Sequence, residues 1–382
     1  MARVSPAGLV FALAGGGLLC LPFMTIAANR IVAGEGVRLW TLGLWGATSG
    51  MALALVAGLS PRPALRLAGG ALGLGCLVWA VSQGSADLLA DAGDYARSGP
   101  AAGVWGLLAV FALLMVDALN AMRPRALMRA LLLVAGGVAV ATVLSSGWLA
   151  GLSIAQEYSA RSAAFWQALL RHLQLALGSL VVASSLGFPL GLLCHRHAGL
   201  RRLLLPMLGF LQTIPSLAMF GIMIPLLAGL ATAAPVLAGL GIAGIGFAPA
   251  FVALVLYALL PVVGNTVAGL EAVPPATAEA ARGIGLSARQ RLWQVELPLG
   301  LPVLLAGLRI VMVQNIGLAV IAGLIGGGGF GGFVFQGLNQ TATDLILLGA
   351  LPTVALALVA AIVMDIAVEL ASPRSATRPA EG

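Results

Sequence analysis

The sequence predicts an all-α, polytopic membrane protein with about ten transmembrane helices. Hydrophobic residues make up 60% of the 382-residue chain and charged residues only 9%, and the mean hydropathy is +1.05. Apolar runs of about 20 residues recur, which is the length that a helix needs to cross the hydrocarbon core of a bilayer. Such a chain is too apolar to be a soluble domain.

Ten apolar runs mark the expected spans. The five in the first half cover roughly residues 7–28, 38–59, 64–83, 102–122 and 128–149. The five in the second half cover roughly residues 170–194, 203–229, 247–270, 300–322 and 345–370. The first run could be mistaken for a signal peptide, but it is long for one and Arg30 follows it closely, so we expect an uncleaved span.

The arginines predict the orientation, because cytoplasmic loops of membrane proteins are enriched in basic residues. With a cytoplasmic N-terminus, 15 of the 20 basic residues fall in inside segments, and the opposite orientation reverses the ratio. We therefore expect both termini to be cytoplasmic. The inside arginines are Arg3, Arg62, Arg66, Arg123, Arg125, Arg129, Arg196, Arg201, Arg202, Arg282, Arg289, Arg291, Arg309, Arg374 and Arg378; the outside ones are Arg30, Arg38, Arg97, Arg161 and Arg171.

The chain contains no lysine, and this excludes some chemistry. A P-loop needs its lysine to reach the nucleotide phosphates, so this chain does not hydrolyse ATP by that route. If ATP drives transport, another polypeptide must use it, and we expect no cofactor on this chain. The net charge of +7 does not indicate nucleic-acid binding, because the arginines lie in scattered short loops. Cys20, Cys76 and Cys194 lack metal-site spacing and are interpreted as small buried hydrophobes.

A polar segment, Glu271–Arg309, interrupts the apolar sequence. Two prolines at its start suit the first turn of a helix, where the N–H that proline lacks would be unpaired anyway. The pattern predicts a short helix over Ala276–Arg282. Gly283 and Gly285 are expected to end it, because glycine tolerates the left-handed conformation of a helix stop.

A second short helix is expected directly afterwards. Ser287, with Gln290 three residues later, reads as a capping box at its start. Leu297-Pro298 is expected to close it. The sequence therefore predicts a compact helical hairpin between two spans, on which another protein docks.

The residues of this hairpin resemble the EAA loop of bacterial ABC importer permeases, in which the loop forms a coupling helix that fits a groove on the cytoplasmic ATPase. The alternative is an interfacial helix that only covers the membrane surface. The resemblance implies that ATPase coupling uses Glu279, Ala280, Ala281, Gly283, Gly285, Leu297 and Pro298.

The spans of the first half contain few polar residues and those of the second half contain more, so we interpret the second half as the working half. Polar groups at membrane depth usually face a bundle interior or a pathway. Pro215 should break the helical hydrogen-bond ladder of its span, leaving carbonyls that Gln212, Thr213 and Ser216 could satisfy. A static kink that only tunes packing is the alternative. The expected pathway residues are Gln212, Thr213, Pro215, Ser216, Tyr257, Pro261, Asn265, Thr266, Gln314 and Asn315.

The segments QTIPSLAMFG and LYALLPVVGNT, together with the coupling loop, resemble the osmoprotectant branch of these permeases. This resemblance implies import of glycine betaine or similar quaternary ammonium solutes across the bacterial inner membrane. It also implies three kinds of partner: ABC ATPase subunits, a second permease subunit and an extracytoplasmic solute-binding protein. The expected organisation is an added bundle of about five spans over 1–150, an amphipathic linker over 151–169, a permease domain over 170–371 and a cytoplasmic tail over 372–382.

Two other classes of protein are alternatives. A secondary transporter driven by a proton or sodium gradient would use Asp117 or Asp365, which also suit interfacial or capping roles. A membrane enzyme is disfavoured because His172 stands apart from other catalytic residue types. The glycine-rich run Gly326–Gly332 lacks the preceding strand of a phosphate loop, and we expect an outer loop there.

Overall fold

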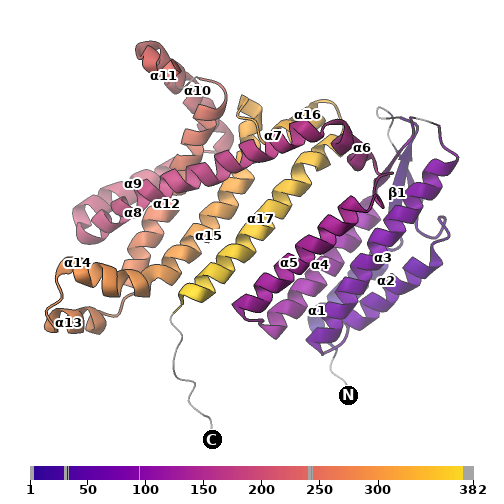
Figure 1. The fold of residues 1–382 in the computed structure, drawn as a ribbon, viewed down its shortest axis with the longest axis horizontal. Helices are drawn as coiled ribbons and strands as arrows, with labels where there is room; N and C mark the ends of the chain where they lie inside the picture. Colours follow the sequence, from indigo (N-terminus) through magenta and orange to yellow (C-terminus); the bar gives the residue numbers. More distant parts are fainter. Residues whose placement is uncertain are drawn as a thin grey trace, which may run out of the picture. The chain divides into compact units, whose positions relative to one another are not determined.

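A computed structural model describes residues 4–29, 32, 34–93, 95–239, 242 and 244–372. The predictions made for Arg3, Arg30, Arg374, Arg378 and the tail beyond 372 lie outside these residues. The chain forms two compact units. The first comprises Met1–Arg161 with Thr341–Asp344, and the second comprises Ser162–Gln340 with Leu345–Gly382. Helices dominate both (Figure 1).

The first unit combines helices with a small sheet. Antiparallel strands lie in the order β2-β1-β3, with Thr25 of the central strand opposite Gly36 and Gly99. The helices are α1 (Pro6–Leu18), α2 (Trp45–Gly58), α3 (Pro63–Ala90), α4 (Ala102–Met122), α5 (Ala126–Ser145) and α6 (Ser153–Ala160); the strands are β1 (Pro22–Ala27), β2 (Glu35–Arg38) and β3 (Arg97–Pro100).

The sheet corrects the first two predicted spans. The expected span 7–28 ends as a helix at Leu18, and its second half is strand β1. The expected span 38–59 becomes helical only at Trp45, after a turn in which Gly43 has φ +67°. Pro22 disfavours helix in the residue before it, and a short apolar run fits a buried strand as well as a helix. Cys20, in the turn that follows α1, is exposed rather than buried.

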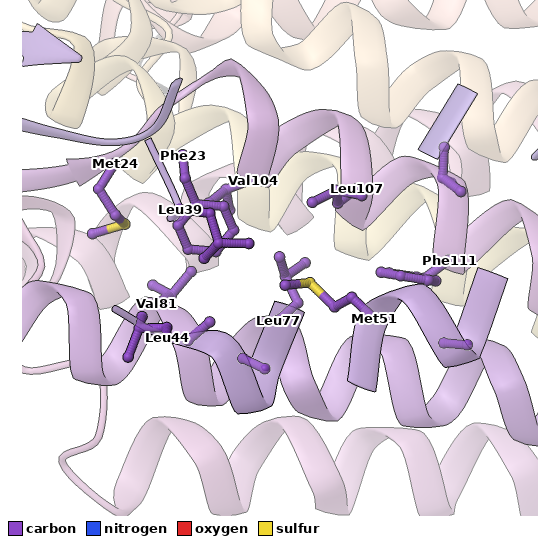
Figure 2. Packing of buried hydrophobic residues seen from close by; sticks show 14 of the residues in the cluster. Phe23, Met24, Leu39, Leu44, Met51, Leu77, Val81, Val104, Leu107 and Phe111 are labelled. Atoms are coloured by element: carbon purple, nitrogen blue, oxygen red, sulfur yellow. The ribbon is translucent and has the colours of Figure 1, made fainter. Parts of the chain in front are cut away.

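The core of the first unit lies between the sheet and α2, α3 and α4. Phe23, Leu39, Met51, Leu77 and Phe111 belong to one buried cluster (Figure 2). Glycines on α3 make this packing possible. A Cβ at Gly73 would collide with the Phe111 ring. By contrast, α5 buries only Ala126.

A buried ion pair joins three helices of the first unit. The Arg66 guanidinium on α3 donates to the carboxylate of Asp117 on α4, and to the Ser5 hydroxyl at 3.0 Å. Ser5 also caps α1 by accepting from the Gly8 N–H at 3.2 Å. The Arg66 side chain is only 8% exposed. Asp117 is therefore the counter-ion of a buried arginine.

We expect Asp117→Asn to lower the free energy of unfolding by about 3 kcal/mol, because it leaves the buried Arg66 charge with neutral partners only. Asp365 pairs with Arg309 on a half-exposed surface, so Asp365→Asn should cost less than about 1 kcal/mol. Thermal unfolding of the two variants in one detergent measures the difference. Equal shifts would contradict the burial argument.

The segment after α5 belongs structurally to the first unit. The Ser98 hydroxyl contacts the Ser85 hydroxyl at 2.6 Å and donates to the Gly151 carbonyl at 3.1 Å. The Glu157 carboxylate on α6 accepts from Arg97 at 3.0 Å and from Arg161 at 3.2 Å. The division between the units thus falls inside the predicted linker, between Arg161 and Ser162.

The second unit is helical throughout its described residues. The expected sixth span begins earlier than predicted, because α7 continues through the π turn η1 into α8 without a break. Its elements are α7 (Ser162–Leu173), η1 (Gln174–Gly178), α8 (Ser179–Arg196), α9 (Ala198–Thr213), α10 (Ser216–Ala233), α11 (Pro235–Gly239), α12 (Phe247–Glu271), α13 (Pro275–Gly283), α14 (Ala288–Arg291), η2 (Leu292–Glu296), α15 (Leu297–Ile321), η3 (Ala322–Ile325), α16 (Gly331–Asn339) and α17 (Thr343–Ala371).

Helix α12 is the centre of the second unit. Fourteen of its 25 residues are buried. Glycines let the neighbouring backbones approach it: a Cβ at Gly191 of α8 would lie 2.5 Å from Thr266, and one at Gly300 of α15 would lie 2.6 Å from the Gly269 carbonyl oxygen. Small residues of this kind are typical of close helix packing in membranes.

Eight helical segments in the described part of the chain are long and apolar enough to cross a membrane, and α1 and α2 are apolar but shorter. The expected seventh span, 203–229, is not one helix. It is broken at Ile214-Pro215 into α9 and α10, both of which Figure 1 shows beside α12. Proline disfavours helical conformation in the residue before it, and Ile214 has extended backbone angles.

Candidate coupling hairpin and helix break

The hairpin begins as the sequence predicts. Pro275 is the first residue of α13, which ends at Gly283. The Leu286 N–H donates to the Ala281 carbonyl at 3.1 Å and the Gly285 N–H to the Arg282 carbonyl at 2.9 Å. With Gly285 at φ +85°, these two bonds form a Schellman stop. The glycine requirement at position 285 is therefore set by the backbone of the hairpin itself.

The predicted capping box is confirmed. Ser287 accepts from the Gln290 N–H at 3.3 Å, and the Gln290 side chain accepts from the Ser287 N–H at 2.9 Å. These bonds satisfy two backbone donors that the start of α14 would otherwise leave free.

The predicted end of the second helix at Leu297-Pro298 is wrong. Helix α14 continues through the π turn η2 into α15, so Leu297 and Pro298 lie in the first turn of a span. The hydrogen bonds of the π turn join residues five positions apart, so the helix can continue although Pro298 has no N–H to donate. Arg291 and Glu296 bridge this turn at 2.6 Å.

The tip of the hairpin is open on the side away from the bundle. Glu279, Ala280 and Gly283 are exposed, whereas Ala281 is buried. A Cβ at Gly283 would have nothing within 4 Å, and its φ is not positive, so this chain alone does not require glycine there.

Two large apolar side chains on the hairpin were not selected from the sequence. Ile284 is 78% exposed and Trp293 is 63% exposed. Side chains of this size in a polar loop are typical of a surface that another protein covers. Their size within an otherwise polar segment was the signal that sequence reasoning missed.

The break between α9 and α10 is tied to α12 by a reciprocal pair of hydrogen bonds. The Gln212 amide donates to the Tyr257 carbonyl at 2.7 Å, and the Tyr257 hydroxyl donates to the Ile214 carbonyl at 2.5 Å. The Tyr257 carbonyl is free because Pro261, four residues later, has no N–H to offer it. Gln212 therefore satisfies a carbonyl on another helix, not one of its own as expected.

The other polar residues near these prolines bond locally. The Thr213 hydroxyl donates to the Phe210 carbonyl at 2.7 Å, Asn265 donates to the Pro261 carbonyl at 2.7 Å, and Thr266 donates to the Val262 carbonyl at 2.7 Å. Of the predicted pathway residues in this region, Thr213 and Pro215 are exposed, Ser216 is half-buried and Thr266 is buried.

Asn315 lies in a buried polar cluster. Its amide donates to the Ser179 hydroxyl at 2.9 Å, and Ser179 donates to the Leu175 carbonyl at 2.5 Å. His172 is fully buried nearby on the same helices, with Nε2 3.1 Å from the Ile316 carbonyl oxygen. Gln314, its neighbour on α15, is half-buried. The Asn315 amide thus bonds to α8, and His172 contacts a carbonyl of α15.

The glycine-rich run packs on α7. Gly328 and Gly329 both have positive φ, and a Cβ at Gly329 would lie 3.2 Å from Nδ1 of His172. The loop and α16 border an open hollow of about 480 Å³ with α7, at the end of the unit opposite α13 (Figure 1). Arg171 lies at this hollow with its guanidinium 4.2 Å from the centre of the Phe247 ring.

The second unit is a bundle of membrane-spanning helices with an exposed hairpin between two of them. This arrangement is compatible with a transport permease. Residues 187–377 match the family model for the binding-protein-dependent transport system inner membrane component, and residues 2–155 match the model for the N-terminal domain of the ABC transporter permease YehY. The chain belongs to the binding-protein-dependent transport system inner membrane component family and is a permease subunit of an ABC importer.

Curated relatives match about half of the chain. The osmoprotectant import permease protein OsmW of Salmonella typhimurium is 40% identical over 189 residues, which is 50% of this chain and 83% of that protein. The carnitine transport permease protein OpuCB of Listeria monocytogenes is 36% identical over 194 residues, 51% of this chain and 80% of that protein.

A solved structure of the MetNI methionine ABC transporter in an inward-facing conformation matches 53% of this chain and 94% of its own chain, with 22% identity and a TM-score of 0.47. Family membership decides against the secondary transporter that was weighed as an alternative. The ion pairs of Asp117 with Arg66 and of Asp365 with Arg309 give both aspartates a structural partner.

Proposed function

We propose that this permease imports glycine betaine or a similar quaternary ammonium solute, and that its α13–α14 hairpin receives the motion of a separate ATPase subunit. The observation that carries the coupling role is the uncovered tip of the hairpin. A Cβ at Gly283 would have open space around it, the adjacent Ile284 exposes its apolar side chain, and so does Trp293 in the π turn that follows α14. The relatives' names, which include osmoprotectant and carnitine, support the solute class.

The orientation proposed is that the hairpin end of the second unit faces the cytoplasm. Arg196, Arg201 and Arg202 lie at the α8–α9 turn, and Arg201 pairs with Glu271 next to α13. This concentration of arginine follows the positive-inside rule. A second permease subunit would complete the pathway, a binding protein would deliver solute from outside, and ATP would bind only to the ATPase.

Within the chain, we assign transport to residues 170–371 and treat 1–150 as an added bundle. The break residues Gln212, Thr213, Pro215 and Ser216 are proposed to border the pathway, together with Tyr257, Pro261, Asn265, Thr266, Gln314 and Asn315. Support comes from exposed Thr213 and Pro215, the least buried of the set.

Reconstituted transport tests this proposal. The permease, with the ATPase and binding protein encoded beside it, is placed in liposomes and given labelled glycine betaine, choline or carnitine. Uptake should require ATP and stop when the ATPase loses its P-loop lysine. Uptake that a proton or sodium gradient drives without ATP would contradict the coupling role, and ATP-driven uptake of a different solute would contradict the solute class alone.

A further inference from the structure

We infer that Gln212 and Tyr257 form a brace that carries motion of the coupling hairpin to the break between α9 and α10; this inference rests on the proposed function. The two hydrogen bonds run in opposite directions between the same pair of segments. Each satisfies a carbonyl that its own helix leaves free: that of Tyr257 because of Pro261, and that of Ile214 because α9 ends there. The brace therefore links the irregularity at Pro261 to the helix break at Pro215.

Helix α9 is held by apolar packing and by polar ties. Leu208 is its only buried residue, and Leu200, Leu204, Leu205 and Leu211 pack, partly buried, against the same apolar cluster, which includes residues of α12. One end of α9 is tied to α12 by the ion pair of Arg201 with Glu271, and the other end by the brace. A helix fixed at both ends to α12 must follow α12 when that helix moves, and the free joint is then Ile214-Pro215.

Helix α12 is built to transmit such a motion. It is continuous from Phe247 to Glu271, and glycine contacts with α8 and α15 pack it tightly. Pro275 opens α13 only four positions beyond Glu271. Tyr257 lies about 21 Å along the helix from its hairpin end, at 1.5 Å per residue. A displacement of the hairpin therefore reaches the brace along one continuous helix, which Pro261 interrupts only in its hydrogen bonding.

A simpler explanation is that Gln212 only satisfies an orphan carbonyl, and one pair of variants separates the two. Gln212→Leu removes one of the two bonds of the brace and leaves the Tyr257 carbonyl unpaired. Adding Pro261→Ala restores an N–H four residues after Tyr257, so the carbonyl is paired again within α12 while the brace stays incomplete. If Gln212 has only the simpler role, the double variant regains all function.

The readout is independent of the solute. Leu217 is exposed in the first turn of α10. It is replaced by cysteine in a protein whose three native cysteines have been changed to alanine, and this protein is reconstituted with the ATPase. We expect ATP with vanadate to change its modification rate by a water-soluble maleimide at least about fivefold, the lower end of typical coupling between sites. Tyr257→Phe and Gln212→Leu should abolish most of this change in modification rate. The double variant Gln212→Leu/Pro261→Ala should recover thermal stability, but its modification rate should still not respond to ATP with vanadate.

Tyr95→Phe is the matched control, because it removes the same hydroxyl from a side chain that is exposed. It should leave the response intact. A full response in Tyr257→Phe or in the double variant would overturn the brace alone. No response in the protein with an intact brace would overturn the proposed ATPase coupling, and the brace with it.

Discussion

Replacing Gly283 with leucine is expected to reduce ATP-driven uptake at least about tenfold, which corresponds to about 1.4 kcal/mol of lost docking free energy. The amount of protein in the membrane should stay the same. A Cβ at Gly283 meets no atom of this chain within 4 Å, and the residue does not have a positive φ, so the fold has room for a side chain. We therefore expect the leucine to displace atoms of a docking partner.

Gly199→Leu is the matched control. Gly199 lies in α9 near the same arginine-rich end of the second unit, and a Cβ there also has nothing within 4 Å. It lies outside the hairpin, so uptake should be close to that of the unaltered protein. Glu279→Lys, which reverses an exposed charge on α13, should act like Gly283→Leu. Normal uptake by both hairpin variants at equal protein level would count against docking at this tip.

The second large effect is on stability. Gly300→Val should lower the free energy of unfolding by about 3 kcal/mol, the upper part of the range for overpacking. A Cβ at Gly300 would lie 2.6 Å from the Gly269 carbonyl oxygen, and one at Gly269 would lie 3.0 Å from the Gly300 carbonyl oxygen. Both obstructing atoms are backbone, so no side-chain rotation relieves the clash, and α15 must move away from α12.

Gly317→Val provides the comparison on the same helix. A Cβ at Gly317 has nothing within 4 Å, so the same substitution should change stability little. Thermal unfolding in detergent, followed by tryptophan fluorescence or by the loss of monodisperse protein, measures both variants. Similar melting temperatures for the two would show that α12 and α15 do not pack as described.

The hairpin was predictable because its determinants are local. Proline at a helix start, glycine at a helix stop and the Ser287–Gln290 capping box all act within a few residues. The one local error, an end at Leu297-Pro298, came from treating proline as a helix stop. The π turn before it lets the helix continue.

The role of Gln212 was not predictable in the same way. Its position beside Pro215 indicated a partner in its own helix, but the carbonyl that it meets belongs to Tyr257 on α12. That carbonyl is free because of Pro261, whose effect is visible in the sequence. Which donor reaches it depends on how α9 and α12 lie against each other, and no local pattern contains that information.

The sequence by itself determined that this protein is a helical membrane protein with a capped helical hairpin between two spans, because hydropathy and cap residues act through transfer free energy and short-range hydrogen bonds. Only the tertiary structure decided that β1 is a strand, that α9 and α10 are separate helices, and that Asp117 and Gln212 have partners on other helices. Hydropathy measures the cost of leaving water and not the backbone conformation. Pairing between distant segments therefore becomes visible only when the chain has folded.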